Sequence, residues 1–177
     1  MKGQKIDGSI QVYYGNGRGK TTAALGLGIR AAGVGKQVIM VQFLKKKHSD
    51  TLDFLKKLEP ELQIFRFEKA ACGYSDLSPK EKQEQMLNIK NALGYSRKVL
   101  DTGQCDLLIL DEIFGLVDYN IITIEELMDL IAVKKDSMDL ILTGRNLPDE
   151  VREIADCVYS IQREKEKTPE ILAQGNF

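Results

Sequence analysis

A glycine-rich segment at residues 15–22, with the sequence GNGRGKTT, most constrains how this 177-residue chain can fold. It follows a short apolar run at residues 10–14 and opens a helical run that begins at Lys20. A strand, a glycine-rich turn and a helix that starts with Lys-Thr form the arrangement that holds a polyphosphate. Glycines let the backbone approach an anion and direct its N–H groups inward. The sequence therefore predicts a phosphate-binding loop at this turn.

The spacing of the loop differs from the common form in one respect. Counting back from Gly19, the first glycine of G-x-x-x-x-G-K-T would lie at Tyr14, whereas this chain has its glycine at Gly15. Lys20 supplies a compact positive charge for the phosphates, and the Thr21 hydroxyl is placed to contact Mg²⁺. Glycine-rich turns also join strands to helices without a ligand, but Lys-Thr at a helix start has no packing role. The pattern therefore favours a site for phosphate and magnesium.

Apolar, β-branched segments alternate with helical segments along the whole chain. Strands that are apolar on both faces are typical of a parallel sheet that helices cover on both sides. We therefore predict an α/β fold with a mostly parallel central sheet, formed by residues 1–177 as a single domain. The expected strands are 9–14, 36–43, 62–67, 106–110, 138–143 and 157–161, and the expected helices are 20–32, 51–58, 78–101, 123–133 and 148–155.

The expected helix at residues 20–32 is apolar on nearly every side, which predicts that it is buried. Gly26 and Gly28 each cost such a helix about 1 kcal/mol relative to alanine. We therefore expect another element to pack closely at both glycines.

Ligands of parallel sheets bind beyond the carboxyl ends of the strands. Asp111 and Glu112 follow the strand expected at 106–110, where a carboxylate can hold Mg²⁺ directly or through water. The alternative is an acidic pair that caps the next segment. Gln42 and Arg145 also follow expected strands, and Arg145 either binds phosphate oxygens or lies on the surface beside a turn.

Three further positions have two readings each. Arg30, near the end of the first helix, is either the exposed edge of that helix or a buried ligand contact. Phe67 and Tyr74, with Phe65 nearby, either pack in the core or line a flat apolar ligand. The lysine run at 45–47 either meets an anion or belongs to a solvated surface loop, where such runs are common.

Composition narrows the class of protein. The net charge is -1 and the sequence pI is about 5.9, so bulk electrostatics do not favour nucleic acid as a partner. The N-terminus has no apolar signal region, and no run reaches the ~20 apolar residues of a membrane span. Three cysteines without a C-x-x-C pair suit a reducing compartment, so we expect a cytoplasmic protein with neither a disulfide framework nor a zinc site.

The segment at residues 11–26 (QVYYGNGRGKTTAALG) closely resembles the ATP:corrinoid adenosyltransferases, which share the shortened glycine spacing. The same resemblance covers most of the chain, in the same order, at residues 30–33, 41–43, 106–112, 142–145 and 155–156. It implies a RecA-like P-loop fold, usually as a homodimer. It also implies transfer of the 5′-deoxyadenosyl group of ATP to a reduced cob(I) corrinoid, with triphosphate leaving and an electron donor that reduces the corrinoid.

The resemblance assigns roles by position. Lys20 and Glu112 would be catalytic, Thr21, Asp111 and Glu112 would lie near Mg²⁺, and Phe67 and Tyr74 would face the corrinoid. The expected ATP-binding residues are Gly15, Asn16, Gly17, Arg18, Gly19, Lys20, Thr21, Thr22, Arg30 and Arg145.

The chain departs from the family pattern in three places. Arg18 replaces a usual lysine, the common aromatic pair with Trp near residues 73–76 is reduced to Tyr74, and a C-terminal Lys-His-Pro segment is missing. Two alternatives therefore stay open beside the adenosyltransferase. One is an NTPase or kinase on the same fold, and the other is a non-catalytic ATP-binding paralogue that has lost corrinoid specificity.

Overall fold

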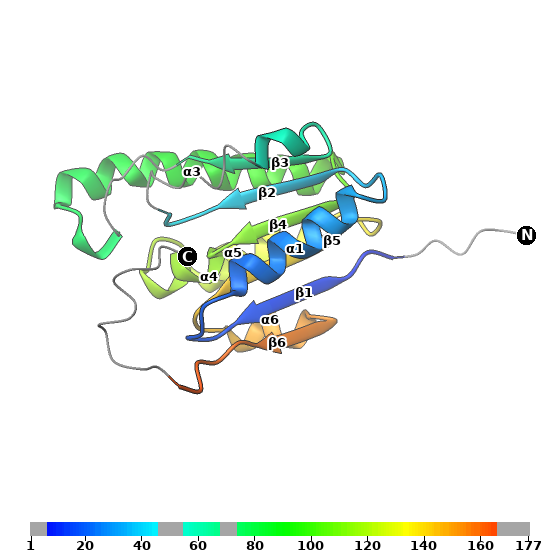
Figure 1. Cartoon of the computed structure of the whole chain (residues 1–177). Helices are drawn as coiled ribbons and strands as arrows, with labels where there is room; N and C mark the ends of the chain where they lie inside the picture. The colour runs from blue at the N-terminus through cyan, green and yellow to red at the C-terminus, as the bar shows by residue number, and fades with distance from the viewer. Residues whose placement is uncertain (1–6, 46–54, 68–73, 166–177) are drawn as a thin grey trace, which may run out of the picture.

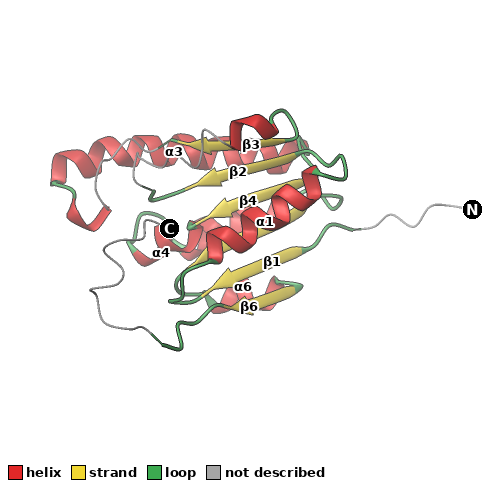
Figure 2. Ribbon diagram, viewed as in Figure 1, coloured by secondary structure: helices red, strands yellow, loops and turns green. Residues whose placement is uncertain are grey.

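The computed structural model describes residues 7–45, 55–67 and 74–165, which form a six-stranded sheet with helices on both faces (Figures 1 and 2). All strand pairs are parallel. This confirms the predicted α/β fold with a parallel central sheet. The strands are β1 (Ile10–Tyr14), β2 (Val38–Gln42), β3 (Leu62–Arg66), β4 (Leu107–Asp111), β5 (Asp139–Gly144) and β6 (Cys157–Ser160).

The helices lie close to where the sequence places them, with two differences. The segment after β4 forms a short helix that the sequence did not predict, and the helix expected at 51–58 is a 3-10 turn at its end, residues 51–54 lying outside the described residues. The helices are α1 (Lys20–Ala32), α3 (Pro79–Thr102), α4 (Ile113–Asp118), α5 (Ile124–Ala132) and α6 (Asp149–Ile154), with 3-10 turns η1 (Lys56–Leu58) and η2 (Tyr74–Asp76).

Local sequence signals mark the starts of α3 and α5, which follow α1 along the chain. Ser78 and Glu81 form a reciprocal capping box at α3, with Pro79 in its first turn, and Thr123 and Glu126 form the same box at α5. Each box satisfies backbone N–H groups that a helix start leaves without partners.

Among the described residues, no helix is both long and apolar enough to span a membrane.

The strand order β3-β2-β4-β5-β1-β6 places β5 between β1 and β4. Tyr14 of β1 pairs with Gly144 of β5, and Gln42 of β2 pairs with Asp111 of β4. The carboxyl ends of these four central strands are therefore in register. Whatever follows them in sequence meets at one edge of the sheet.

Alternate side chains of the strands divide the core into two layers. On one face, buried residues of β2 and β4, among them Met40 and Ile109, pack against α1, whose buried residues include Ala24. On the other face, strand residues such as Leu108 pack against α3, α4, α5 and α6. In Figure 1, α1 crosses the near face of the sheet, and the other α-helices lie behind the sheet.

The expectation that α1 is buried on all sides is wrong. Only Ala24 and Gly28 of this helix are buried, and Ile29 is 40% exposed. The reason is that α1 is the one α-helix on its face within the described residues, so nothing there covers its outer side. The helix is apolar because it carries many small residues, not because it is enclosed.

The two α1 glycines also differ. At Gly28 a Cβ atom would lie 3.1 Å from the Ile109 Cδ1 atom and 3.4 Å from the Val38 Cγ1 atom, so helix and sheet are in close contact. At Gly26, a Cβ atom would meet nothing within 4 Å in the described part of the chain. The close packing expected at both positions is confirmed at Gly28 and wrong at Gly26.

Paired substitutions at these glycines test this packing. Gly26→Ala should raise the free energy of unfolding by about 0.5–1 kcal/mol, because it removes backbone entropy from the unfolded chain without a clash. Gly28→Leu should lower the free energy of unfolding by about 1–3 kcal/mol, because the side chain has no space between α1 and the sheet. Chemical denaturation measures both, and a Gly28→Leu variant as stable as the parent would contradict the packing of α1.

Candidate nucleotide and metal site

The glycine-rich loop is fixed to the ends of the neighbouring strands. The Gly15 N–H donates to the carbonyls of Gly144 (3.2 Å) and Arg145 (3.0 Å), and the Gly17 N–H donates to the carbonyl of Ile161 (2.9 Å). A Cβ atom at Gly17 would lie 2.8 Å from that same carbonyl oxygen, and a Cβ atom at Gly15, where φ is 122°, would also clash with it. Two of the loop glycines are therefore required by contacts with the protein itself, in addition to any contact with phosphate.

Gly19 leaves the start of α1 without a side-chain cap. It has φ 110°, a left-handed conformation that favours glycine, and it offers no capping side chain to the helix. The N–H groups of the first helical turn have no intrahelical partners, so they are left to bind an anion. Of the other expected ATP-binding residues here, Asn16, Arg18 and Thr22 are exposed around the loop.

Lys20 is folded back over the loop. Its Nζ atom donates to the carbonyls of Gly15 (2.7 Å) and Gly17 (3.0 Å). Burial lowers the pKa of the Lys20 ammonium, an effect that the charge of Glu112 opposes and that Lys45 and Arg145 reinforce. These charged groups therefore lie within electrostatic reach of one another at the strand ends.

The centre of the site is Asp111, at the end of β4, whose side chain is fully buried. Its carboxylate accepts hydrogen bonds from the Thr21 hydroxyl (2.9 Å), the Thr143 hydroxyl (2.7 Å) and the Gln42 amide (3.0 Å). The Lys45 ammonium adds an ion pair at 3.5 Å. Hydrogen bonds and a countercharge offset the large cost of burying a carboxylate. These contacts, rather than capping of the next helix, therefore account for the position of the Asp111 side chain.

Gln42 extends this cluster to the next strand. Its Oε1 atom accepts a hydrogen bond from Arg66 Nε (2.7 Å) while its amide nitrogen donates to Asp111. Burial lowers the pKa of the Arg66 guanidinium, and the nearby charge of Asp111 opposes that shift. The sequence analysis did not single out Arg66, although its place at the end of β3 was a usable signal.

Glu112 begins the short helix α4 from an unusual backbone conformation. It has φ 63°, and its N–H donates to the Thr143 hydroxyl (2.8 Å). Thr143 thus connects Asp111 and Glu112 through one hydroxyl group. A left-handed conformation is uncommon for a residue other than glycine and is often found at functional sites. It turns the chain so that half-buried Glu112 stays within electrostatic reach of Lys20.

The donor groups fit a magnesium ion. Thr21, Asp111 and Glu112 offer hydroxyl and carboxylate oxygens, the ligands that Mg²⁺ prefers. Among residues 7–45, 55–67 and 74–165, no group of three or more His, Cys, Asp or Glu side chains could hold a metal by itself. Mg²⁺ beside a nucleotide is usually bound through one or two protein groups together with phosphates and water.

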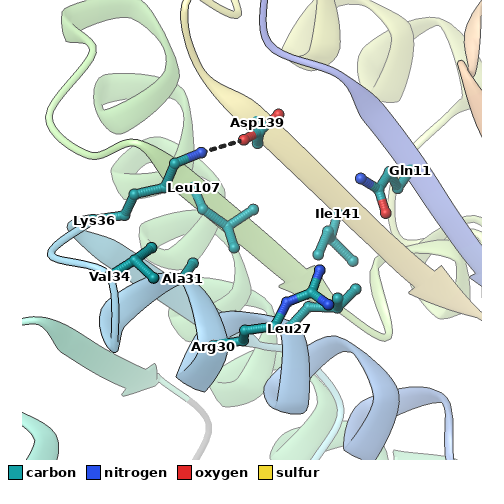
Figure 3. A pocket seen from close by; sticks show the side chains of 9 residues that line it. All are labelled: Gln11, Leu27, Arg30, Ala31, Val34, Lys36, Leu107, Asp139 and Ile141. Atoms are coloured by element: carbon teal, nitrogen blue, oxygen red, sulfur yellow. Dashed lines mark hydrogen bonds and ion pairs between the residues drawn. The ribbon is translucent and has the colours of Figure 1, made fainter.

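The two arginines predicted to bind ATP occupy different places. Arg145 is exposed directly after β5, its carbonyl accepts from Gly15, and it lies within electrostatic reach of Lys20. Arg30 lies in the last turn of α1, ten residues and thus about 15 Å along the helix from Lys20. It lines a separate cavity of about 310 Å³, where Figure 3 shows its guanidinium turned toward Ile141 and Gln11. The structure does not bring Arg30 to the loop, and its contact with ATP stays a prediction.

The two aromatic residues expected to face a corrinoid both pack partly buried against the core, as the alternative reading had it, and they have different ring partners. Phe67 packs against Tyr95, with ring centroids 5.8 Å apart. Tyr74 packs against Tyr119, with centroids 5.3 Å apart, and the Lys82 ammonium lies 5.7 Å from the Tyr74 ring centroid. Tyr119 is 48% exposed and follows α4. The sequence analysis missed Tyr119 because the helix that positions it was not predicted.

Comparisons with known proteins agree with this geometry. Residues 6–174 match the ATP:corrinoid adenosyltransferase family BtuR/CobO/CobP. The corrinoid adenosyltransferase of Escherichia coli K12 is 30% identical over 155 residues, which cover 88% of this chain and 76% of that protein. The corrinoid adenosyltransferase CobA of Salmonella typhimurium is 30% identical over 159 residues, covering 90% of this chain and 79% of that protein.

Solved structures support the fold alone. A KaiC-like protein of Pyrococcus horikoshii superposes with a TM-score of 0.56 at 19% identity, covering 88% of this chain and 72% of that one. The ATP synthase subunit NeqB of Nanoarchaeum equitans superposes with a TM-score of 0.59 at 18% identity, covering 87% of this chain and 45% of that one.

The shared hydroxyl of Thr143 offers a test of the buried cluster. Thr143→Val keeps the shape of the side chain but removes one hydrogen bond to the Asp111 carboxylate and one from the Glu112 N–H. We expect the free energy of unfolding to fall by about 2–4 kcal/mol, measured by chemical denaturation.

Thr102→Val is the matched control. Its hydroxyl only donates to the Lys98 carbonyl on the exposed end of α3 (2.7 Å), so its loss should change the stability by less than about 0.5 kcal/mol. Equal effects of the two substitutions would contradict the role given to Thr143.

Proposed function

The chain belongs to the ATP:corrinoid adenosyltransferase family, and on that premise we propose that it transfers the 5′-deoxyadenosyl group of ATP to the cobalt of a reduced cob(I) corrinoid, releasing triphosphate. The chain is a transferase by the same membership. One observation supports ATP as the donor: the buried Asp111 carboxylate accepts a hydrogen bond from the Thr21 hydroxyl, directly beside Lys20 and the uncapped start of α1. That combination suits a polyphosphate with its magnesium ion.

The loop residues would act on the triphosphate. The first-turn N–H groups of α1 and the Lys20 ammonium bind its oxygens once Lys20 leaves the carbonyls of Gly15 and Gly17. Thr21 and Asp111, with Glu112 nearby, would hold Mg²⁺, which neutralises charge on the phosphates when it is bound. Exposed Arg145 is placed to add a further positive charge. These groups together stabilise the negative charge that develops on a departing triphosphate.

The proposed reaction needs no protein nucleophile. Co(I) attacks the ribose C5′ atom with an electron pair, a Co–C bond forms, and the C5′–O bond breaks with its electrons going to the triphosphate. No proton is transferred in that step, so the protein has to orient ATP rather than to supply a base. The cofactor would be Mg²⁺, with ATP and the corrinoid as substrates. An external electron donor for the corrinoid, a homodimer and a cytoplasmic location stay predictions.

An assay with purified protein tests the proposal directly. We expect ATP, Mg²⁺ and chemically reduced cob(I)alamin to give adenosylcobalamin and triphosphate in equal amounts. Orthophosphate released without a corrinoid would instead indicate an NTPase. Tight ATP binding without product would indicate a non-catalytic paralogue.

Lys20→Ala should lower turnover at least 100-fold, because it removes the charge that faces the leaving triphosphate. Lys36→Ala is its control, because Lys36 forms a partly exposed ion pair with Asp139 (3.0 Å) at the start of β5, at the opposite end of that strand from the loop. Full activity of Lys20→Ala would refute the site.

The pair Tyr74 and Tyr119 can be tested as the corrinoid-facing surface. In this chain, which has no Trp, Tyr74 of η2 and the half-exposed Tyr119 at the end of α4 form a pair of tilted rings that can offer apolar area to a corrinoid. Tyr119→Ala should raise the KM for the corrinoid several-fold and leave the KM for ATP unchanged. Tyr159→Ala is the control, because Tyr159 is equally exposed but stacks on Tyr13 at the β6 edge of the sheet (4.8 Å). A parallel change in both KM values would contradict this assignment.

A further inference from the structure

The Lys45 ammonium contacts two of the residues that are expected to hold a magnesium ion. Its Nζ atom donates to the Thr21 hydroxyl (3.2 Å) and pairs with the Asp111 Oδ2 atom at 3.5 Å. These are two of the residues expected to hold the metal, and the Thr21 hydroxyl and Asp111 Oδ2 are themselves only 3.1 Å apart. We propose that Lys45 is a displaceable counter-ion, which neutralises Asp111 in the nucleotide-free protein and has to leave when Mg²⁺ binds with ATP.

A countercharge at this position is needed in the absence of a ligand. Asp111 is fully buried, and an ionised carboxylate without compensation is costly to bury. Three neutral donors, from Thr21, Thr143 and Gln42, supply hydrogen bonds but no net charge. The Lys45 ammonium supplies the positive charge that forms an ion pair with the carboxylate, and the charges of Arg66 and Lys20 also lie within electrostatic reach.

The metal and the ammonium compete for the same oxygens. Lys45 donates into a lone pair of the Thr21 hydroxyl, the atom that would coordinate Mg²⁺. Mg²⁺ binds oxygen ligands at about 2.0–2.1 Å, so a metal between Thr21 and Asp111 would face the ammonium at short range. Two positive charges at such a distance repel in a partly buried site. Exchange of one for the other keeps Asp111 neutralised throughout.

The lysine can leave without disturbing the core. Its side chain is 29% exposed, and the residue lies beyond the end of β2, after Leu44, whose φ of 55° turns the chain away from the strand direction. The long side chain can therefore move its ammonium toward solvent or toward the phosphates while β2 stays in place. This distinguishes Lys45 from Gln42, which is buried and fixed by hydrogen bonds on both sides.

Lys45→Met separates this role from a simple phosphate contact. The quantity to measure is the ratio of two ATP dissociation constants, one with EDTA and one with saturating Mg²⁺, by isothermal titration. If Lys45 competes with the metal, the ratio rises about 3–10-fold in Lys45→Met relative to the parent, because Mg²⁺ no longer displaces an ammonium. An unchanged or smaller ratio overturns the proposal, because Lys45 and Mg²⁺ would then be compatible.

Thermal unfolding without nucleotide is the second readout, and it does not depend on the proposed function. Lys45→Met should lower the ligand-free Tm by about 2–6 °C, and 10 mM Mg²⁺ alone should raise the Tm of this variant more than that of the parent. Lys36→Met, which breaks a more exposed ion pair, should shift the Tm by less and show no added response to Mg²⁺. An equal Tm and an equal Mg²⁺ response in Lys45→Met and the parent overturn the counter-ion role.

The proposal rests on the proposed function only for the identity of the nucleotide. If the parent protein fails to bind ATP with or without Mg²⁺, the proposed function fails, while the comparison of Tm values still tests Lys45. If the parent binds Mg²⁺-ATP more tightly than ATP alone but Lys45→Met leaves the ratio unchanged, the counter-ion role fails and the proposed function stands.

Discussion

The hydrogen bonds of one buried carboxylate organise the edge of the sheet at which the candidate site lies. Asp111 collects donors from the start of α1, the end of β2 and the end of β5, so three segments far apart in sequence have to lie within bonding distance of one side chain. A carboxylate in that position is costly unless every one of those donors is present. The site and the sheet therefore depend on each other. The sheet brings the donors together, and a shift in strand register would break hydrogen bonds to the buried carboxylate and so destabilise the fold.

The strand order explains why these groups converge. With β5 between β1 and β4, the Thr143 hydroxyl lies between the glycine-rich loop on one side and Asp111 with Glu112 on the other. The loop is in turn fixed to β5 and to the segment after β6 through its own N–H groups. Its glycines thus satisfy two demands, close contact with neighbouring carbonyls and an open helix start for an anion. This shared demand gives a physical reason for a loop with its first glycine at Gly15.

Most of the fold could be predicted from the sequence because its signals are local or periodic. Apolar strands, capping boxes at Ser78 and Thr123, and the glycine-rich turn each depend on neighbouring residues. The burial of α1 was predicted wrongly, because composition does not reveal whether a second layer covers a helix. Lys45 looked like part of a solvated lysine run, and α4 went unpredicted. Both depend on contacts with residues distant in sequence, Asp111 in one case and the Glu112–Thr143 hydrogen bond in the other.

The two ends of the proposed reaction rest on different kinds of structure. At the nucleotide end, buried groups hold one another, and replacing any of them leaves an unpaired charge or donor in the interior. At the proposed acceptor end, the exposed ring of Tyr119 and half-buried Tyr74 would offer area rather than a network of hydrogen bonds, and substitutions there should cost little stability. Such a surface can change its aromatic residues while the nucleotide site stays intact. This accounts for a chain that keeps the family's phosphate loop and carboxylates and yet has no tryptophan near Tyr74.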